Sequence, residues 1–351
     1  MNDETMLERE QQAFLLDTLQ KLLGQDSPSG FTHKATALAK DIAQGLGFEA
    51  WLTNKGNLVV KVPGRETGRT VGLCAHVDTL GLMVRSITDK GELLFTTVGG
   101  PSLPTLDGEY CTIFTRDGRR YTGTVLSLSP AVHVFDDART RPRDIQNMYV
   151  RLDEKVRSAD DVRALGIEVG DYIAYDSKTV FTDSGFLKSR FIDDKGSVAI
   201  LLTFLHWLKE SGKSPRCNVE ITFTVYEEVG HGGATFSPAL TELLAVDMGC
   251  VGLDLSCDEY TVSICAADSA GPYDYDMVTR LSNLARENHI PAVLDVYPHY
   301  SSDVAVAWKS GLDVPAALIG PGVQASHGME RTHVDAMLAT LALVERYLDC
   351  R

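Results

Sequence analysis

Hydrophobic residues recur at helical spacing in several parts of the chain. Leu15, Leu19, Leu22 and Leu23 lie on one face of the segment 8–23, and polar turn residues follow it. This spacing predicts a helix over 8–23 and, by the same criterion, helices over 33–46, 197–209, 276–287 and 334–348. Continuous apolar runs rich in β-branched residues predict strands at 58–62, 70–75, 218–225, 251–255 and 314–319.

The segment between residues 80 and 184 has a different pattern. Short β-type runs such as 121–126 and 172–175 alternate there with Gly, Asp and Pro turns, whereas helices and strands alternate on either side. The chain is therefore predicted to be an α/β protein in which a β-rich insert interrupts one domain. We expect the insert to span 80–184 and the α/β domain to comprise 1–79 and 185–351.

Amino-acid composition and net charge exclude some classes of function. The 351 residues are 44% hydrophobic and 23% charged, as in ordinary globular chains, and 33 Lys and Arg against 48 Asp and Glu give a net charge of −15. This charge repels phosphate backbones and anionic lipids, so we expect neither a nucleic-acid nor a membrane partner. The seven cysteines form no CxxC pair, and the first 12 residues resemble no signal peptide. We predict a reduced, cytoplasmic protein.

Histidine and acidic residues follow predicted strands, where open α/β sheets usually bind ligands. His76 follows the run 70–75, and Asp78 could accept the second ring N–H of a metal-bound His76. A histidine at a strand end is nevertheless more often a satisfied polar residue than a ligand. Asp193 and Asp194 precede an apolar helix, so they are either its N-cap or metal ligands.

Other segments supply further candidates. Glu227 and Glu228 follow a β-branched strand and are either a solvated strand end or a metal ligand beside a general base. Asp254 lies in an apolar run, where an unpaired buried charge would be costly. His327 and His333 share one polar loop, and either could bind metal.

Together these residues form a mixed nitrogen and oxygen ligand set that suits zinc, cobalt or manganese. A dinuclear site needs one bridging carboxylate and two more ligands for each ion. The five segments together supply a His, an Asp, a Glu, a second Asp and a second His, which matches this requirement and leaves one Glu for acid–base chemistry.

The set resembles the glutamyl and tetrahedral aminopeptidases, also called the cellulase-M family, which are dinuclear metallo-aminopeptidases of bacteria and archaea. The resemblance runs nearly end to end, and its specificity lies in the order and spacing of the motifs. These motifs are Ser27-Pro28-Ser29-Gly30, His76-Val77-Asp78, Gly99-Gly100, Leu165-Gly166-Ile167-Glu168-Val169-Gly170-Asp171, Asp193-Asp194, Glu227-Glu228-Val229-Gly230, Asp254 and Ser302-Asp303. The implied fold is a mixed-sheet α/β catalytic domain that is interrupted by a small β-barrel-like assembly domain.

The resemblance also implies roles for individual residues. Asp193 would bridge two divalent ions, with His76 and Asp254 completing one site and Glu228 and His327 the other. Glu227 would be the general base in hydrolysis of the N-terminal residue from a short peptide. Asp78 would orient His76, and the Asp193–Asp194 peptide would be cis. Zinc is the expected metal, with cobalt or manganese as alternatives, and the family implies a homo-oligomer, often a tetrahedral dodecamer.

The sequence departs from the family pattern at several positions. Lys195 stands where the family usually has Arg, His231 stands where it has an apolar residue, and the run 324–329 replaces Tyr-Ile-His-Ser-Pro. We prefer His327 as the ligand because Glu330 follows three residues later, as in the family. The run 326–333 is similar to that of a divergent branch associated with gene clusters for the osmoprotectant N-acetylglutaminylglutamine amide. That similarity implies a small Gln- or Glu-containing peptide as substrate.

Other functions compete with the aminopeptidase. The same ligands could serve a deacylase or carboxypeptidase that acts on a small N-acylated Gln- or Glu-type peptide. Acidic groups such as Asp303 would bind a substrate ammonium, whereas His299, Lys195 or His231 would bind a carboxylate. A non-catalytic oligomeric binding protein would be expected to lose the base or a ligand, and the sequence retains all of them.

Overall fold

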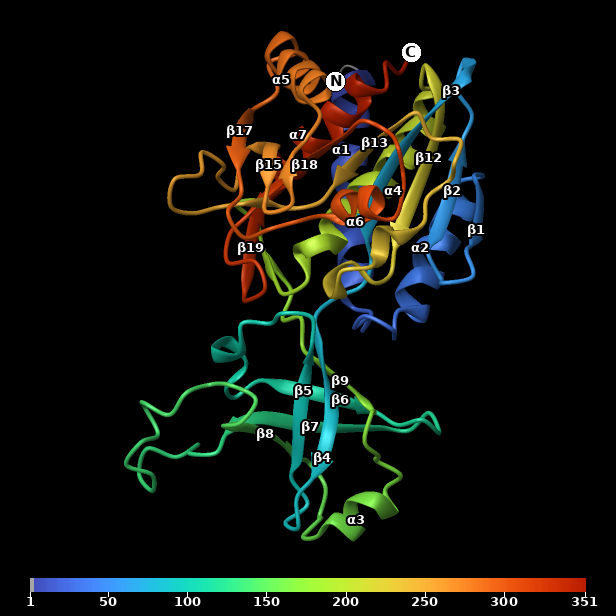
Figure 1. Cartoon of the computed structure of the whole chain (residues 1–351). Coiled ribbons are helices and arrows are strands. Elements are labelled where there is room, and N and C mark those ends of the chain that lie inside the picture. The colour runs from blue at the N-terminus through green and yellow to red at the C-terminus, as the bar shows by residue number, and fades with distance from the viewer. Residues whose placement is uncertain (1–2) are drawn as a thin grey trace.

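A mixed sheet forms the centre of the larger unit in the computed structural model, which describes residues 3–351 (Figure 1). Parallel strands form its middle, and antiparallel strands flank them. The strand order is β1 (Glu49–Leu52), β2 (Leu58–Val62), β12 (Cys217–Thr224), β3 (Glu66–His76), β13 (Glu242–Val246), β18 (Ala316–Val323), β15 (Val262–Asp268) and β16 (Gly271–Pro272). In addition, β14 (Gly249–Cys250) pairs with β18, and β17 (Ala292–Val296) pairs with β15.

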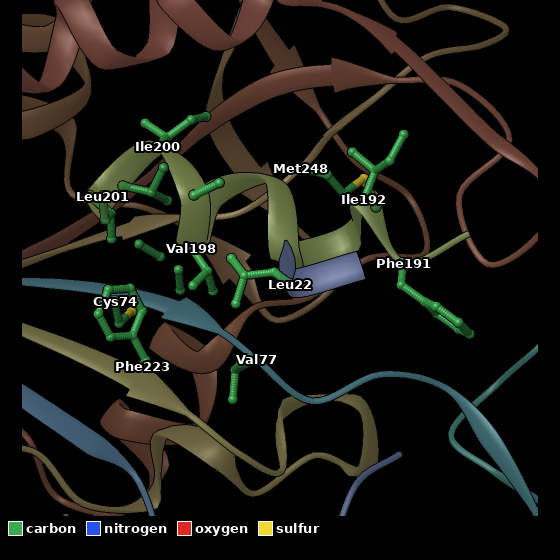
Figure 2. Close-up of a cluster of buried hydrophobic side chains, with 14 of the residues drawn as sticks. Leu22, Cys74, Val77, Phe191, Ile192, Val198, Ile200, Leu201, Phe223 and Met248 are labelled. Carbon is green, nitrogen blue, oxygen red and sulfur yellow. The ribbon is translucent and has the colours of Figure 1, made fainter. Parts of the chain in front are cut away.

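Helices cover the sheet because its central strands are apolar on both faces. Every residue of β13 and β18 is buried. The helix α4 (Ile192–Ser211) is apolar around most of its circumference and packs against α1 (Asp3–Leu23), α7 (Val334–Tyr347) and β3. Figure 2 shows part of this core, including Leu22, Cys74, Val198 and Phe223. The remaining helices of this unit are α2 (His33–Gly45), α5 (Tyr275–Glu287) and α6 (Asp303–Lys309).

A closed six-stranded barrel forms the second unit and lies at one end of the first (Figure 1). Its strands alternate buried apolar residues such as Val125 and Val150 with more exposed ones, which is the pattern of a small filled barrel. In spatial order the strands are β4 (Gly81–Ile87), β5 (Leu93–Val98), β8 (Met148–Leu152), β7 (Arg120–Ser127), β6 (Tyr110–Phe114) and β9 (Tyr172–Tyr175). The 3-10 helix η1 (Leu103–Leu106) and the helix α3 (Ala159–Ala164) lie in its connections.

A third, small sheet follows the barrel and connects it to the end of the chain. It consists of β10 (Val180–Phe181), β11 (Phe186–Ser189) and β19 (Glu330–His333). Nearby, the buried Arg190 guanidinium donates to the buried Glu109 carboxylate at 2.8 Å and to the Asp176 carbonyl. Because Glu109 and Asp176 flank the barrel strands β6 and β9, this ion pair joins the barrel to the segment that leads into α4.

Most elements expected from the sequence are present, and the predicted α/β fold with an inserted barrel is confirmed. The strand predicted at 251–255 is wrong. Gly252 has φ +151 and Leu253 has φ +41, so the chain turns there instead of extending. The strands β13 and β15 and the helix α6 were not predicted. The seven thiols are free, and no described helix is long and apolar enough to cross a membrane.

Candidate metal centre

The ends of neighbouring strands bring the candidate residues to one edge of the sheet. His76 is the last residue of β3 and pairs with Thr224, the last residue of the parallel strand β12. Glu227 and Glu228 follow β12 in the 3-10 helix η2 (Glu227–Val229), and Asp247 follows β13 directly. The start of α4 and the loop between β18 and β19 reach the same place, so five separate segments meet there.

Two groups of ligating side chains share one residue. One atom each from His76, Asp193 and Asp247 lie within 4.8 Å of one another, and the same holds for Asp193, Glu228 and His327. The His76 Nε2 atom is 3.1 Å from Asp193 Oδ1. The His327 Nε2 atom is 3.5 Å from Glu228 Oε2 and 3.7 Å from Asp193 Oδ2. Asp193 therefore turns one carboxylate oxygen toward each group, as a bridging ligand would.

Asp254 does not take part in this cluster, which corrects the ligand set expected from the sequence. It is exposed in the turn after β14, whereas Asp247 is buried and completes the group with His76 and Asp193. Both acids follow apolar runs, but only the strand that precedes Asp247 pairs with β3. The other four expected ligands, His76, Asp193, Glu228 and His327, lie together.

In both His76 and His327, the ring nitrogen that faces the carboxylates carries no proton when the imidazole is neutral. The Nδ1 atoms of His76 and His327 each lie 2.9 Å from a main-chain carbonyl, of Asp78 and Gly100 respectively. Because a carbonyl only accepts hydrogen bonds, each Nδ1 atom carries the ring proton. In the neutral ring, the Nε2 atom therefore has a lone pair and no proton. A second proton or a cation must therefore lie between Nε2 and the carboxylates.

The charge balance of the cluster also favours a cation. Burial raises the pKa values of the Glu227 and Glu228 carboxyls well above their usual range and raises the pKa of Asp247 to about 7. The Glu228 Oε1 atom is buried and has no hydrogen-bond partner among the described residues. Buried carboxylates without a compensating charge are costly. The donor set and its unmet charge thus fit divalent metal ions.

Asp78 contacts the cluster differently from its expected role. Its fully buried carboxylate accepts hydrogen bonds from Ser29 Oγ at 2.5 Å and from the main-chain N–H groups of Glu227 at 3.1 Å and Glu228 at 3.3 Å. Its Oδ1 atom is 3.7 Å from His76 Nδ1, which donates instead to the Asp78 carbonyl. The main chain of Asp78 thus orients the imidazole, and its carboxylate holds the Glu pair.

Glu227 lies beside the first group. Its Oε2 atom is 3.7 Å from His76 Nε2, and its side chain is 16% exposed to solvent. The buried Asp303 carboxylate accepts from Thr224 Oγ1 and from the Gly233 N–H, both at 2.5 Å, and so fixes the loop next to Glu227. Asp303 is therefore occupied by contacts within the protein.

Neighbours of Asp193 fix the loop that carries His327. Ser326 Oγ donates to Asp193 Oδ2 at 3.0 Å, and the Glu330 carboxylate accepts from the N–H groups of Asp193 and His327. His333 lies elsewhere, because its Nδ1 accepts from the Asp335 N–H and its Nε2 donates to the Ser184 carbonyl. The sequence identified Glu330 only as a marker for His327, and the role of Ser326 was not predicted.

Other residues singled out from the sequence are accounted for as follows. The Asp193–Asp194 peptide is cis, as the resemblance implied. Lys195 is fully buried and its Nζ donates to the Gln25 carbonyl at 2.6 Å, so it faces no substrate. His231 is exposed and stacks on Tyr226 at 4.6 Å.

Comparisons with known proteins identify what the chain is similar to. Residues 56–343 match the model of the M42 glutamyl aminopeptidase family. YhfE of Bacillus subtilis (strain 168) is 41% identical over 340 residues, which cover 95% of this chain and 96% of that protein. The glutamyl aminopeptidase of Lactococcus lactis subsp. cremoris (strain MG1363) is 26% identical over 225 residues, or 64% of this chain and 62% of that protein.

Solved structures show the same fold. The aminopeptidase APDkam598 from Desulfurococcus kamchatkensis superposes with a TM-score of 0.85 at 22% identity, covering 96% of this chain and 95% of that one. The TET1 peptidase of Pyrococcus horikoshii, described as able to assemble into a tetrahedron or a large octahedral shell, gives a TM-score of 0.81 at 20% identity, covering 95% and 99%.

Proposed function

Because the chain belongs to the M42 glutamyl aminopeptidase family, we propose that it is a dinuclear metal-dependent aminopeptidase with Glu227 as its general base. Family membership confirms the resemblance found in the sequence and makes the chain a metal-dependent peptide-bond hydrolase. The observation that carries the finer proposal is the pair of ligating groups that share Asp193.

Two ions would each be held by one of the two groups. His76, Asp193 and Asp247 would hold one ion, and Asp193, Glu228 and His327 would hold the other. When bound, such ions lower the pKa of a water and polarise the scissile carbonyl. Zinc fits this donor set, and cobalt or manganese fits it as well.

The chain's own residues supply proton transfer and orientation. The Glu227 carboxylate lies at the edge of the first group, where it takes a proton from the attacking water and passes it to the leaving amine. Asp78 holds the Glu227 N–H and thereby keeps the base in place.

The proposed oligomeric state rests on similarity to a solved structure, whereas the cellular location and the associated peptide rest on the sequence. Because the TET1 peptidase has the same fold and assembles into shells, we propose a homo-oligomer for this chain, with a tetrahedral dodecamer as the expected form. A cytoplasmic location remains a prediction from the sequence, as does the association with an osmoprotectant peptide.

The experiment is the substitution Glu227→Gln in the full-length chain loaded with metal. It should lower kcat by about 100- to 10,000-fold, because the amide cannot transfer the proton, while the metal content stays at the wild-type value. Glu66→Gln is the matched control, since Glu66 is an exposed residue at the start of β3 whose carboxylate forms an ion pair with Arg216 and with no other described residue. Full turnover by the Glu227→Gln protein would overturn the assignment of the base.

A further inference from the structure

A cavity of about 940 Å³ opens next to the candidate metal centre. Ser326, His327 and Met248 are among its lining residues, and Met248 directly follows Asp247 in the chain. Ser326 donates to Asp193, and His327 belongs to the second ligating group, so the cavity reaches both groups. Its volume is in the range of cavities that bind small ligands. A substrate whose peptide bond lies at the metal centre can therefore place a side chain in it.

The walls of this cavity are mainly apolar. Edge strand β17 contributes Leu294 and Val296, which are 50% and 61% exposed, and the turn after β14 contributes the fully exposed Leu253. The other apolar lining residues are Met248, Cys250, Val251, Leu255, Ala266, Tyr297, Pro298 and Tyr300. Exposed large apolar side chains that surround a cavity are typical of a binding surface.

The charged residues of the cavity disfavour an acidic ligand. No Lys or Arg is among the described residues that line it, and its imidazoles are those of the exposed His299 and of His327, which is a candidate metal ligand. The buried Asp295 is occupied, because its Oδ1 accepts from the Ser256 N–H at 2.7 Å and its Oδ2 from Ser263 Oγ at 3.1 Å. Asp254 is exposed at the cavity. A substrate carboxylate that entered the cavity would lose hydrating water without gaining an ion pair to arginine or lysine. It would also be repelled by the negative charge of Asp254.

We propose that this cavity receives the side chain of the substrate's N-terminal residue and selects large apolar residues, such as leucine and phenylalanine, over glutamate. This inference rests on the proposed function and gives its substrate class. It differs from the preference that the family name suggests, because that preference calls for a permanently charged cation, and the described lining residues include no Lys or Arg.

The test measures kcat/KM for 7-amido-4-methylcoumarin derivatives of leucine, phenylalanine, alanine, glutamate and lysine with the metal-loaded chain. Leucine should exceed both alanine and glutamate by about 100-fold, as expected when several methylenes enter an apolar cavity. The variant Leu294→Lys should lower the ratio of leucine to glutamate by at least about 10-fold. Tyr275→Lys is the matched control, because Tyr275 is 80% exposed and does not line the cavity, and it should leave the ratio unchanged.

Other outcomes have defined meanings. Glutamate or lysine as the best substrate would overturn the inference, as would a Leu294→Lys protein whose mass in light scattering changes while its substrate ratio does not. Binding of leucine amide and of glutamic acid α-amide to the Glu227→Gln protein separates this inference from the proposed function. Preferred binding of leucine amide supports the cavity assignment even if no derivative is hydrolysed, and equal binding contradicts it.

Discussion

The assignment of Asp247 to the metal centre gives a sharp prediction about two acids that lie close together in the sequence. Replacing Asp247 by Asn removes the charge of a buried side chain whose oxygen lies within 4.8 Å of ligating atoms of His76 and Asp193. Replacing Asp254 by Asn removes the same charge from an exposed turn. Only the first change should weaken metal binding.

The size of the effect follows from the number of ligands. Asp247 is one of three side chains in its group, and loss of a residue that merely supports a ligand already weakens metal binding by about 10- to 100-fold. We therefore expect at least about 100-fold weaker binding of one ion, or about 2.7 kcal/mol. At a metal concentration of about 1,000 times the wild-type Kd, stabilisation by that ion should fall from about 4.1 to about 1.4 kcal/mol.

The assay is calorimetric titration of the metal-free chain with zinc or manganese, combined with urea unfolding at fixed metal concentration. The Asp247→Asn protein should show one tight and one weak ion, and the Asp254→Asn protein should match the wild type. Normal metal binding by Asp247→Asn together with weakened binding by Asp254→Asn would refute the assignment.

Further predictions concern single residues. His327→Ala should lower the metal content, whereas His333→Ala should leave it unchanged and cost about 1 kcal/mol of stability, because His333 caps α7; the reverse pattern by plasma mass spectrometry would exchange the two assignments. Asp78→Asn should lower kcat about 10- to 100-fold, because Glu227 and Glu228 donate to different oxygens of Asp78 and an amide replaces one of these oxygens by an NH2 donor; unchanged kcat would contradict that role. Burial raises the pKa of Glu345 from the ordinary 4.5 to about 7, so the folded chain loses stability as the pH rises from about 4.5 to about 7, where the unfolded chain releases this proton first. Glu345→Gln should therefore raise the free energy of unfolding by up to about 3 kcal/mol at pH 8.5 and by little at pH 4, and an equal gain at both pH values would be inconsistent with this.

The sequence predicted the covered parallel strands well, because runs such as 70–75 and 314–319 are almost entirely free of charged residues and rich in apolar ones. The prediction of strands from the sequence failed at 242–255, where two apolar runs each end near an aspartate. The choice between Asp247 and Asp254 depends on which run pairs with β3, and that pairing is a long-range contact that local periodicity does not contain.

The contacts of the Asp78 side chain differ from the expected one for a related reason. The spacing His76-Val77-Asp78 suggests a contact between the two side chains, since they are close in the sequence. The acceptor sites of Asp78 are instead occupied by Ser29, Glu227 and Glu228, which lie 49, 149 and 150 residues away. The ligand set itself was largely predictable, because it follows strand ends that the apolar runs already locate.

The central claim is a dinuclear centre that hydrolyses peptides at a free amino terminus. The most direct measurement is metal content per purified chain, paired with hydrolysis of leucine dipeptides that carry a free or an acetylated amino group. We predict two ions per chain and cleavage of the free dipeptide alone, lost with a chelator and restored by zinc, cobalt or manganese. Absence of bound metal, or cleavage of the acetylated dipeptide alone, would contradict the account.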